Sequence, residues 1–172
     1  ITNVGAVSLK TRDQIQSLEK MAVELGRTTK FTATQSANAM EIMSRAGFKT
    51  NEILAATPAV LAAAAASGLE IAEVADVVSN ALKGMGLEAT EAGNVADILA
   101  LASSRTNSSI GSLGESLKNV ASTARQLNIP ITETVASIAL LQDVGLDASV
   151  AGSAFNVMLT KMAAPSAGMT KK

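Results

Sequence analysis

A short phrase recurs along the chain at points where one helix is expected to stop and the next to begin. It consists of Gly or Asn, then an apolar residue, and then an acid four residues after the apolar one. The complete copies read Gly47-Phe48 to Glu52, Gly68-Leu69 to Glu73, Gly86-Leu87 to Glu91 and Asn128-Ile129 to Glu133, and Gly145-Leu146 to Val150 keeps the joint without the acid. The spacing of these phrases limits the chain to short elements.

Each phrase has the chemistry of a helix end joined directly to a helix start. Gly or Asn accepts the left-handed backbone that closes a helix, and the following apolar residue packs back on the turn that has just ended. The acid then lies in the first turn of the next helix, where free N–H groups and the helix dipole favour negative charge. The sequence therefore predicts an all-α fold, a compact stack of about eight short helices joined by tight Gly-containing corners. The predicted structural corners are Gly47, Gly68, Gly86, Asn128 and Gly145.

The apolar residues follow a helical period between these corners, and no stretch alternates in the way a half-buried strand would. The predicted helices cover about 11–26, 32–46, 50–67, 69–86, 90–102, 112–127, 132–144 and 147–162. Thr32 and Gln35 form a capping box, and Gly26 and Gly84 are expected to help close their helices. Pro58 predicts either a kink or the start of a new helix. In the last helix Val150, Ala154, Val157 and Met158 form the expected apolar face.

The sequence contains no linker rich in Pro, Gly or Ser between Thr11 and Met162, which predicts one domain. The expected division is an extended lead-in at 1–10, a helical core domain at 11–163 and an exit linker at 164–172. Because the first residue is Ile1 and not Met, we expect the chain to be a piece of a longer protein.

The composition argues against most enzyme and nucleic-acid chemistry. There is no Cys and no His, which removes thiol and imidazole nucleophiles, the commonest general base and the usual transition-metal ligands. Fourteen basic and fifteen acidic residues give a net charge of −1, and Trp and Tyr are absent, so neither a basic footprint nor a stacking platform for nucleic acid is present. The prediction is a protein that is not an enzyme and needs no cofactor or metal. The apolar residues are nearly all aliphatic residues, Ala and Met, with three Phe, so small and smooth helix faces are expected to approach one another closely.

Acids and glycines that suggest chemistry have a simpler interpretation. Paired carboxylates could serve acid–base catalysis, but their recurrence at helix starts favours capping; they are Glu52, Glu70, Glu73, Glu88, Glu91 and Glu133. The segments 84–86 and 111–114 are rich in glycine, yet neither ends in the Lys-Ser or Lys-Thr of a phosphate-binding loop.

Two segments remain as candidate contact sites. Met40 and Met43, with Phe48 nearby, are candidates for an oligomer or partner contact, although filling of the core is the simpler use of Met. The stretch 53–69 has no charged residue and could meet a membrane. The candidate membrane-contacting residues are Ala59, Val60, Leu61, Ala62 and Ala66. Pro58 and Gly68 interrupt the stretch, which favours a buried core segment instead.

An ordered set of phrases resembles the core domain of tailed-phage tail tape-measure proteins, the phage minor tail protein family. The matching words include Thr29-Lys30-Phe31-Thr32, Ala46-Gly47-Phe48, Ala66-Ser67-Gly68-Leu69, Asn80-Ala81-Leu82-Lys83-Gly84-Met85-Gly86-Leu87-Glu88-Ala89, Leu113-Gly114-Glu115-Ser116-Leu117-Lys118 and Gly152-Ser153-Ala154-Phe155. They cover most of the chain, from about Leu25 to Ala163.

The resemblance implies a structural virion protein of the tail tube lumen or tail tip, made in the host cytoplasm and released when the genome is ejected. It implies a part in tail assembly and length determination, and this compact domain is expected to anchor or plug and not to measure. The expected partners are other copies, as a trimer or hexamer, and tail-tube and tail-tip or baseplate-hub proteins. No specific nucleic acid is expected. The alternative function is a membrane-active module that contacts the host membrane during ejection.

Overall fold

The computed structural model describes residues 12–163, which form a chain of short helices. The elements are α2 (Arg12–Thr28), α3 (Ala33–Arg45), α4 (Thr50–Ser67), α5 (Ile71–Met85), the 3₁₀ turn η1 (Ala89–Glu91), α6 (Ala92–Arg105), α7 (Ile110–Gln126), α8 (Ile131–Asp143) and α9 (Ala148–Ala163). No strand occurs between residues 12 and 163. The all-α prediction is confirmed, whereas the predicted lead-in at 1–10 and exit linker at 164–172 lie outside the described residues.

The predicted corners have the backbone that the sequence requires. Positive φ values occur at all five of them: Gly47 (90°), Gly68 (72°), Gly86 (67°), Asn128 (56°) and Gly145 (96°). Four corners close with the paired hydrogen bonds of a Schellman motif. At Gly47, for example, its N–H donates to Ser44 O at 2.9 Å and the next N–H, of Phe48, donates to Met43 O at 3.1 Å. Gly68 uses the simpler αL form, with one bond to Ala64 O.

The residues that follow the corners behave as expected at four joints of five. Phe48, Leu69, Leu87 and Ile129 are partly buried against the core. Leu146, which follows the corner that lacks an acid, stays 37% exposed. The acid of the first joint caps the next helix, since a Glu52 carboxylate oxygen accepts the Lys49 N–H at 2.7 Å. The α8–α9 joint therefore differs from the other four in leaving its apolar residue more exposed.

Several predicted boundaries shift, and glycine accounts for two of the errors. Gly26 and Gly84 lie inside α2 and α5 and do not end them. Each has a packing reason to be Gly, because an added Cβ would lie 2.6 Å from Ala33 N or 2.8 Å from Ala121 Cβ. Pro58 lies inside α4, so the alternative that it starts a new helix is wrong. The Thr32–Gln35 capping box is confirmed, with Thr32 N–H donating to Gln35 Oε1 at 2.9 Å.

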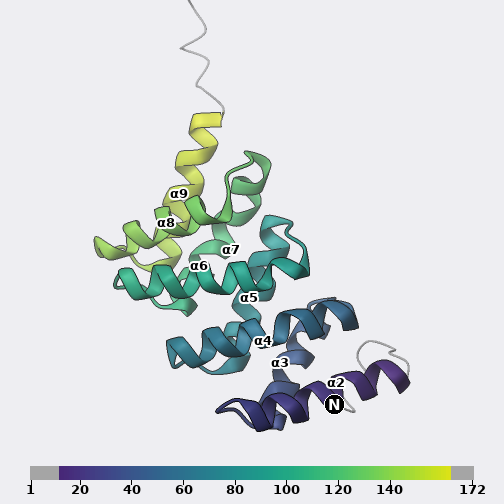
Figure 1. Cartoon of the computed structure of the whole chain (residues 1–172). Helices are drawn as coiled ribbons and strands as arrows, with labels where there is room; N and C mark the ends of the chain where they lie inside the picture. The colour runs from purple at the N-terminus through teal and green to yellow at the C-terminus, as the bar shows by residue number, and fades with distance from the viewer. Residues whose placement is uncertain (1–11, 164–172) are drawn as a thin grey trace, which may run out of the picture.

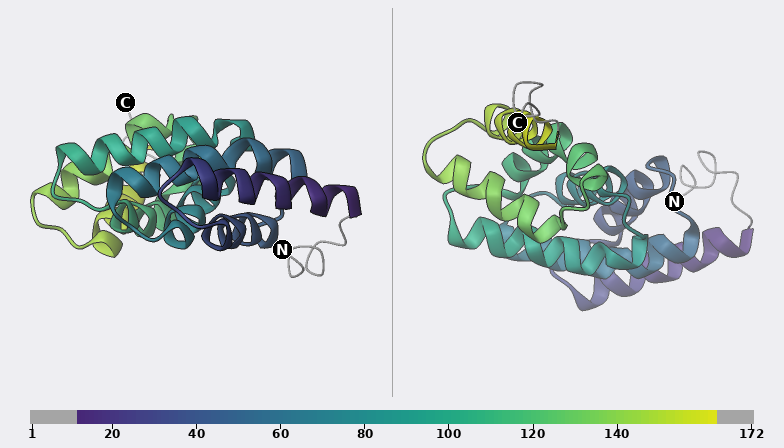
Figure 2. Two further views of the ribbon diagram at one scale, coloured as in Figure 1. Left: turned by 60° about the horizontal axis from the view of Figure 1, so that its bottom comes forward. Right: turned by 90° about the horizontal axis from the view of Figure 1, so that it is seen from above.

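The helices stack in approximate chain order, with α2 at one end and α9 at the other (Figure 1). α4 packs on α3, α5 and α6, and α5 packs on α3, α6 and α7, so these two helices form the centre. In the view from above, α8 lies between α6 and α9, while α9 packs mainly on α7 (Figure 2). The two ends of the stack therefore each present a helix that is covered on one side.

Small residues set the helix spacing, as the composition predicts. α9 crosses α7 where a Cβ added at Gly152 would lie 2.8 Å from Ser116 Cα. Gly114 of α7 packs against α5 in a similar way, because a Cβ added at Gly114 would lie 2.6 Å from Val77 Cγ2. Ala and Gly thus take positions where a larger side chain would push two backbones apart.

We expect Gly68→Ala and Gly145→Ala to lower the free energy of unfolding by about 1 kcal/mol each, because alanine must adopt a positive φ. Neither position has another atom within 4 Å of an added Cβ, so steric overlap adds nothing. Urea denaturation followed by circular dichroism measures the change. Midpoints equal to that of the natural chain in both variants would contradict the left-handed corners.

Candidate functional surfaces

The two Met residues proposed as a partner contact are part of the core. Met40 has no exposed surface, and Met43 is 2% exposed. Phe48 is partly buried and packs against the same core. The side chains pack inward because α3 lies between α2 and α5, which cover it on two sides. In this fold Met40 and Met43 therefore fill the core and offer almost no exposed surface to another protein.

The uncharged stretch 53–69 is also mostly interior. Val60 and Leu61 are buried in α4, while Ala62 and Ala66 are exposed and Ala59 is intermediate. The larger aliphatic side chains thus lie mostly inside, and the exposed positions of the stretch are alanines together with Pro58 and Gly68. No helix in the described part of the chain has the length and apolar character to cross a membrane. In this fold the segment offers a lipid surface little apolar area.

The charged groups form no cluster that could hold a metal ion anywhere in 12–163. The acids lie mainly at helix starts, with Glu52, Glu73 and Glu133 in first turns. The Glu73 carboxylate also lies against Gly111, near the N-terminus of α7, where the helix dipole favours it. A single ion pair, Arg45–Glu41, is recorded between residues 12 and 163. Within 12–163, Glu52 is the one of these acids with a recorded capping hydrogen bond, whereas Glu70, Glu88 and Glu91 stand at N-cap positions without one. The positions of the acids at helix starts therefore fit a favourable interaction with the helix dipole more generally than side-chain capping.

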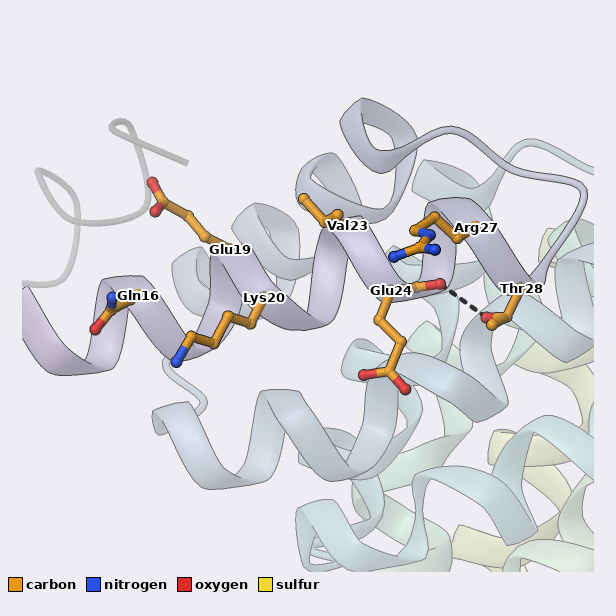
Figure 3. Close-up of a pocket in the computed structure, with 7 residues that line it drawn as sticks. All are labelled: Gln16, Glu19, Lys20, Val23, Glu24, Arg27 and Thr28. Atoms are coloured by element: carbon orange, nitrogen blue, oxygen red, sulfur yellow. Dashed lines mark hydrogen bonds between the residues drawn. The ribbon is translucent and has the colours of Figure 1, made fainter.

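The outer face of α2, at the first end of the stack, borders a hollow of about 750 Å³ (Figure 3). Its described lining comes from one helix and mixes both signs of charge with Val23; the residues are Gln16, Glu19, Lys20, Val23, Glu24, Arg27 and Thr28. The Thr28 hydroxyl donates to Glu24 O at 2.9 Å, which ties it to its own helix. This face has the composition of a solvated helix surface.

A second hollow lies between α6 and α8 and is nearly all apolar. It has a volume of about 310 Å³, and its lining includes Ile98, Leu101, Val135 and Leu140, with Arg105 at one end. Leu101 and Leu140 are 51% and 63% exposed. The groove has the apolar walls and open sides of a surface for another helix and lacks the enclosed polar groups of a substrate site.

The outer side of α9 is the third surface and the largest departure from the sequence analysis. Val150, Val157 and Met158 were expected to face the core, yet they are 47–51% exposed. The buried side consists instead of Ala151, Gly152, Phe155 and Leu159. The second side of α9 is thus apolar and uncovered by the described part of the chain. Its signal was present in the sequence, since apolar residues occupy more of α9 than one buried face needs.

Comparisons with known proteins bear on what such a domain is. The family model described as phage-related minor tail protein matches residues 19–172. The chain belongs to the phage-related minor tail protein family. It is 36% identical over 171 residues to the tape measure protein of Pneumococcus phage Dp-1. It is also 27% identical over 156 residues to the probable tape measure protein of Escherichia phage P2. No solved structure matches the chain.

The match covers nearly all of this chain but little of its relatives. The aligned regions take in 99% and 91% of the chain, and only 15% of the Dp-1 protein and 19% of the P2 protein. The sequence therefore corresponds to a domain-sized part of these tape measure proteins. The minor tail protein family makes the chain a component of a phage tail, which is a structural role.

Proposed function

We propose that this minor tail protein domain acts as a compact anchor or plug of a tape measure protein, in the tail tube lumen or at the tail tip. The observation that supports this most is the folded stack itself. A ruler transmits length through a continuous extended element, at about 1.5 Å per residue of helix. A chain that turns back at five corners cannot do this, whereas it can fill a lumen and bind neighbours.

The domain serves tail assembly and leaves the tail at genome ejection, and it associates with further copies and with tail-tube or hub proteins. The exposed apolar surfaces on α6–α8 and on α9 support this association, since apolar patches bordered by polar residues commonly mark interaction sites. Sedimentation velocity of residues 1–172 at high concentration, together with pull-down of purified tail proteins, tests it. A strict monomer that recovers no tail protein would end this proposal.

A membrane-active role during ejection is the second candidate, and the exposed apolar side of α9 is what favours it. Leakage of a trapped dye from lipid vesicles separates the two functions. For an anchoring domain we expect residues 1–172 to release no more dye than an unrelated helical protein of the same net charge. Release that rises with protein concentration would instead support the membrane role.

A further inference from the structure

The outer side of α9 carries an apolar stripe that is bounded by one charge of each sign. The stripe consists of Val150, Ala154, Val157 and Met158, which recur at the three- and four-residue spacing of one helix side. Ala154 is exposed like its neighbours. The polar residues Ser149, Ser153 and Thr160 lie together on a neighbouring side of α9, next to the stripe. α9 therefore has a second seam of the kind that packs against another helix.

Asp147 and Lys161 stand at the two ends of this stripe. Asp147 precedes α9, and its carbonyl accepts the Ala151 N–H at 2.8 Å, which places it at the helix start. Lys161 is the sole charged residue of α9 and follows Asp147 by 14 residues, close to four helical turns, so both lie on the stripe side. Both are exposed, and neither takes part in an ion pair recorded within 12–163.

The positions along the stripe are symmetric about Ala154. Asp147 and Lys161 are each seven residues from it, and Val150 and Met158 are each four residues from it. A helix with this pattern is complementary to a copy of itself that runs in the opposite direction. Asp147 then meets Lys161 of the other helix at both ends, Val150 meets Met158, and the small Ala154 lies at the crossing, where helix axes come within 8–10 Å.

We propose that α9 pairs with α9 of a second copy of this chain, antiparallel, about a two-fold axis beside Ala154. The charges select the direction, because a parallel pair would place Lys161 beside Lys161 and Asp147 beside Asp147. The opposed helix dipoles favour the same direction. This inference rests on the self-association part of the proposed function and specifies its interface. Such pairs account for two copies, or for six copies as three pairs, and not for three.

Cysteine cross-linking tests the pairing directly, because the natural chain contains no Cys. Two single variants of residues 1–172, Val150→Cys and Met158→Cys, are purified reduced and then oxidised with copper phenanthroline, separately and mixed. We expect a disulfide-linked dimer mainly in the mixture, since position 150 of one copy faces position 158 of the other. Thr160→Cys, on another side of α9, is the matched control and should give no dimer above background.

A charge exchange tests the two ends of the seam. We expect Lys161→Glu to weaken dimerisation about tenfold. The dimer would then contain two introduced carboxylates, one in each copy, and each would face Asp147 of the other copy. Adding Asp147→Lys to the same chain restores opposite charges at both ends and should recover most of the affinity. Circular dichroism of each variant checks that the helices remain.

The outcomes separate this inference from the proposed function. Dimers linked between positions 150 and 158, with recovery in the double charge variant, support the α9 pair. Cross-linking of Val150→Cys alone, or oligomers that form without any 150–158 link, would overturn the antiparallel pair while leaving self-association in place. A strict monomer in sedimentation would overturn both.

Discussion

Replacing Gly152 by alanine should destabilise the domain by about 3 kcal/mol, the upper part of the usual range for overpacking. A Cβ at this position would lie 2.8 Å from Ser116 Cα and 2.9 Å from its carbonyl carbon. Both are backbone atoms of α7, so no side chain can rotate away to make room. The methyl group must therefore separate α9 from α7.

The separation also breaks polar contacts that fix α9 in place. Ser116 Oγ donates to Ala148 O, and Gln142 Nε2 of α8 donates to Ser116 Oγ at 2.8 Å. This network joins three helices at the Gly152 crossing. We therefore expect the loss to appear as a lower urea midpoint and as reduced protection of α9 amides from hydrogen exchange.

Gly93→Ala is the matched control for this prediction. Gly93 also lies in a helix, but its added Cβ would meet Ala59 Cβ at an ordinary 3.7 Å. The free energy of unfolding of the Gly93→Ala variant should equal that of the natural chain or be slightly higher, because alanine is a better helix former than glycine. Equal midpoints for Gly152→Ala and Gly93→Ala would show that α7 and α9 are not in close contact.

The corners could be predicted from the sequence because their cause is local. A positive φ, the hydrogen bonds that close a helix and the acid of the next turn all involve residues a few positions apart. Gly47 and Asn128 could therefore be placed without any knowledge of the tertiary fold. Gly26 and Gly84 could not, since their reason to be Gly is the close approach of another helix.

The candidate surfaces depend on tertiary packing, which the sequence pattern leaves open. Periodicity shows which residues share one side of a helix but not which side meets a neighbour. In α9 the larger side chains, Val150, Val157 and Met158, suggested the core face, yet small residues at positions 151 and 152 allow the close crossing with α7. Met40 shows the reverse case, a candidate surface residue that the fold buries.

Deletion of residues 50–84 from the full-length phage protein should abolish tail assembly or infectivity and should not give shorter tails. The deletion removes α4 and α5, which connect α3 with α6 and α7 at the centre of the stack. It takes with it fully buried side chains such as Ile53, Val60 and Leu82, so α2 and α3 lose the core that joins them to α6–α9. Electron microscopy of particles and plaque counts measure the result.

The alternative outcome is quantitative. If residues 50–84 were part of an extended helical ruler, their removal would shorten each tail by about 50 Å, at a rise of about 1.5 Å per residue. Infectious particles with tails shortened by that amount would show that the segment is extended in the virion.

In Gly152→Ala phage, a compact anchor predicts fewer particles but tails of normal length, because the substitution weakens the fold without changing the number of residues. A parallel loss in both variants would tie assembly to the folded stack.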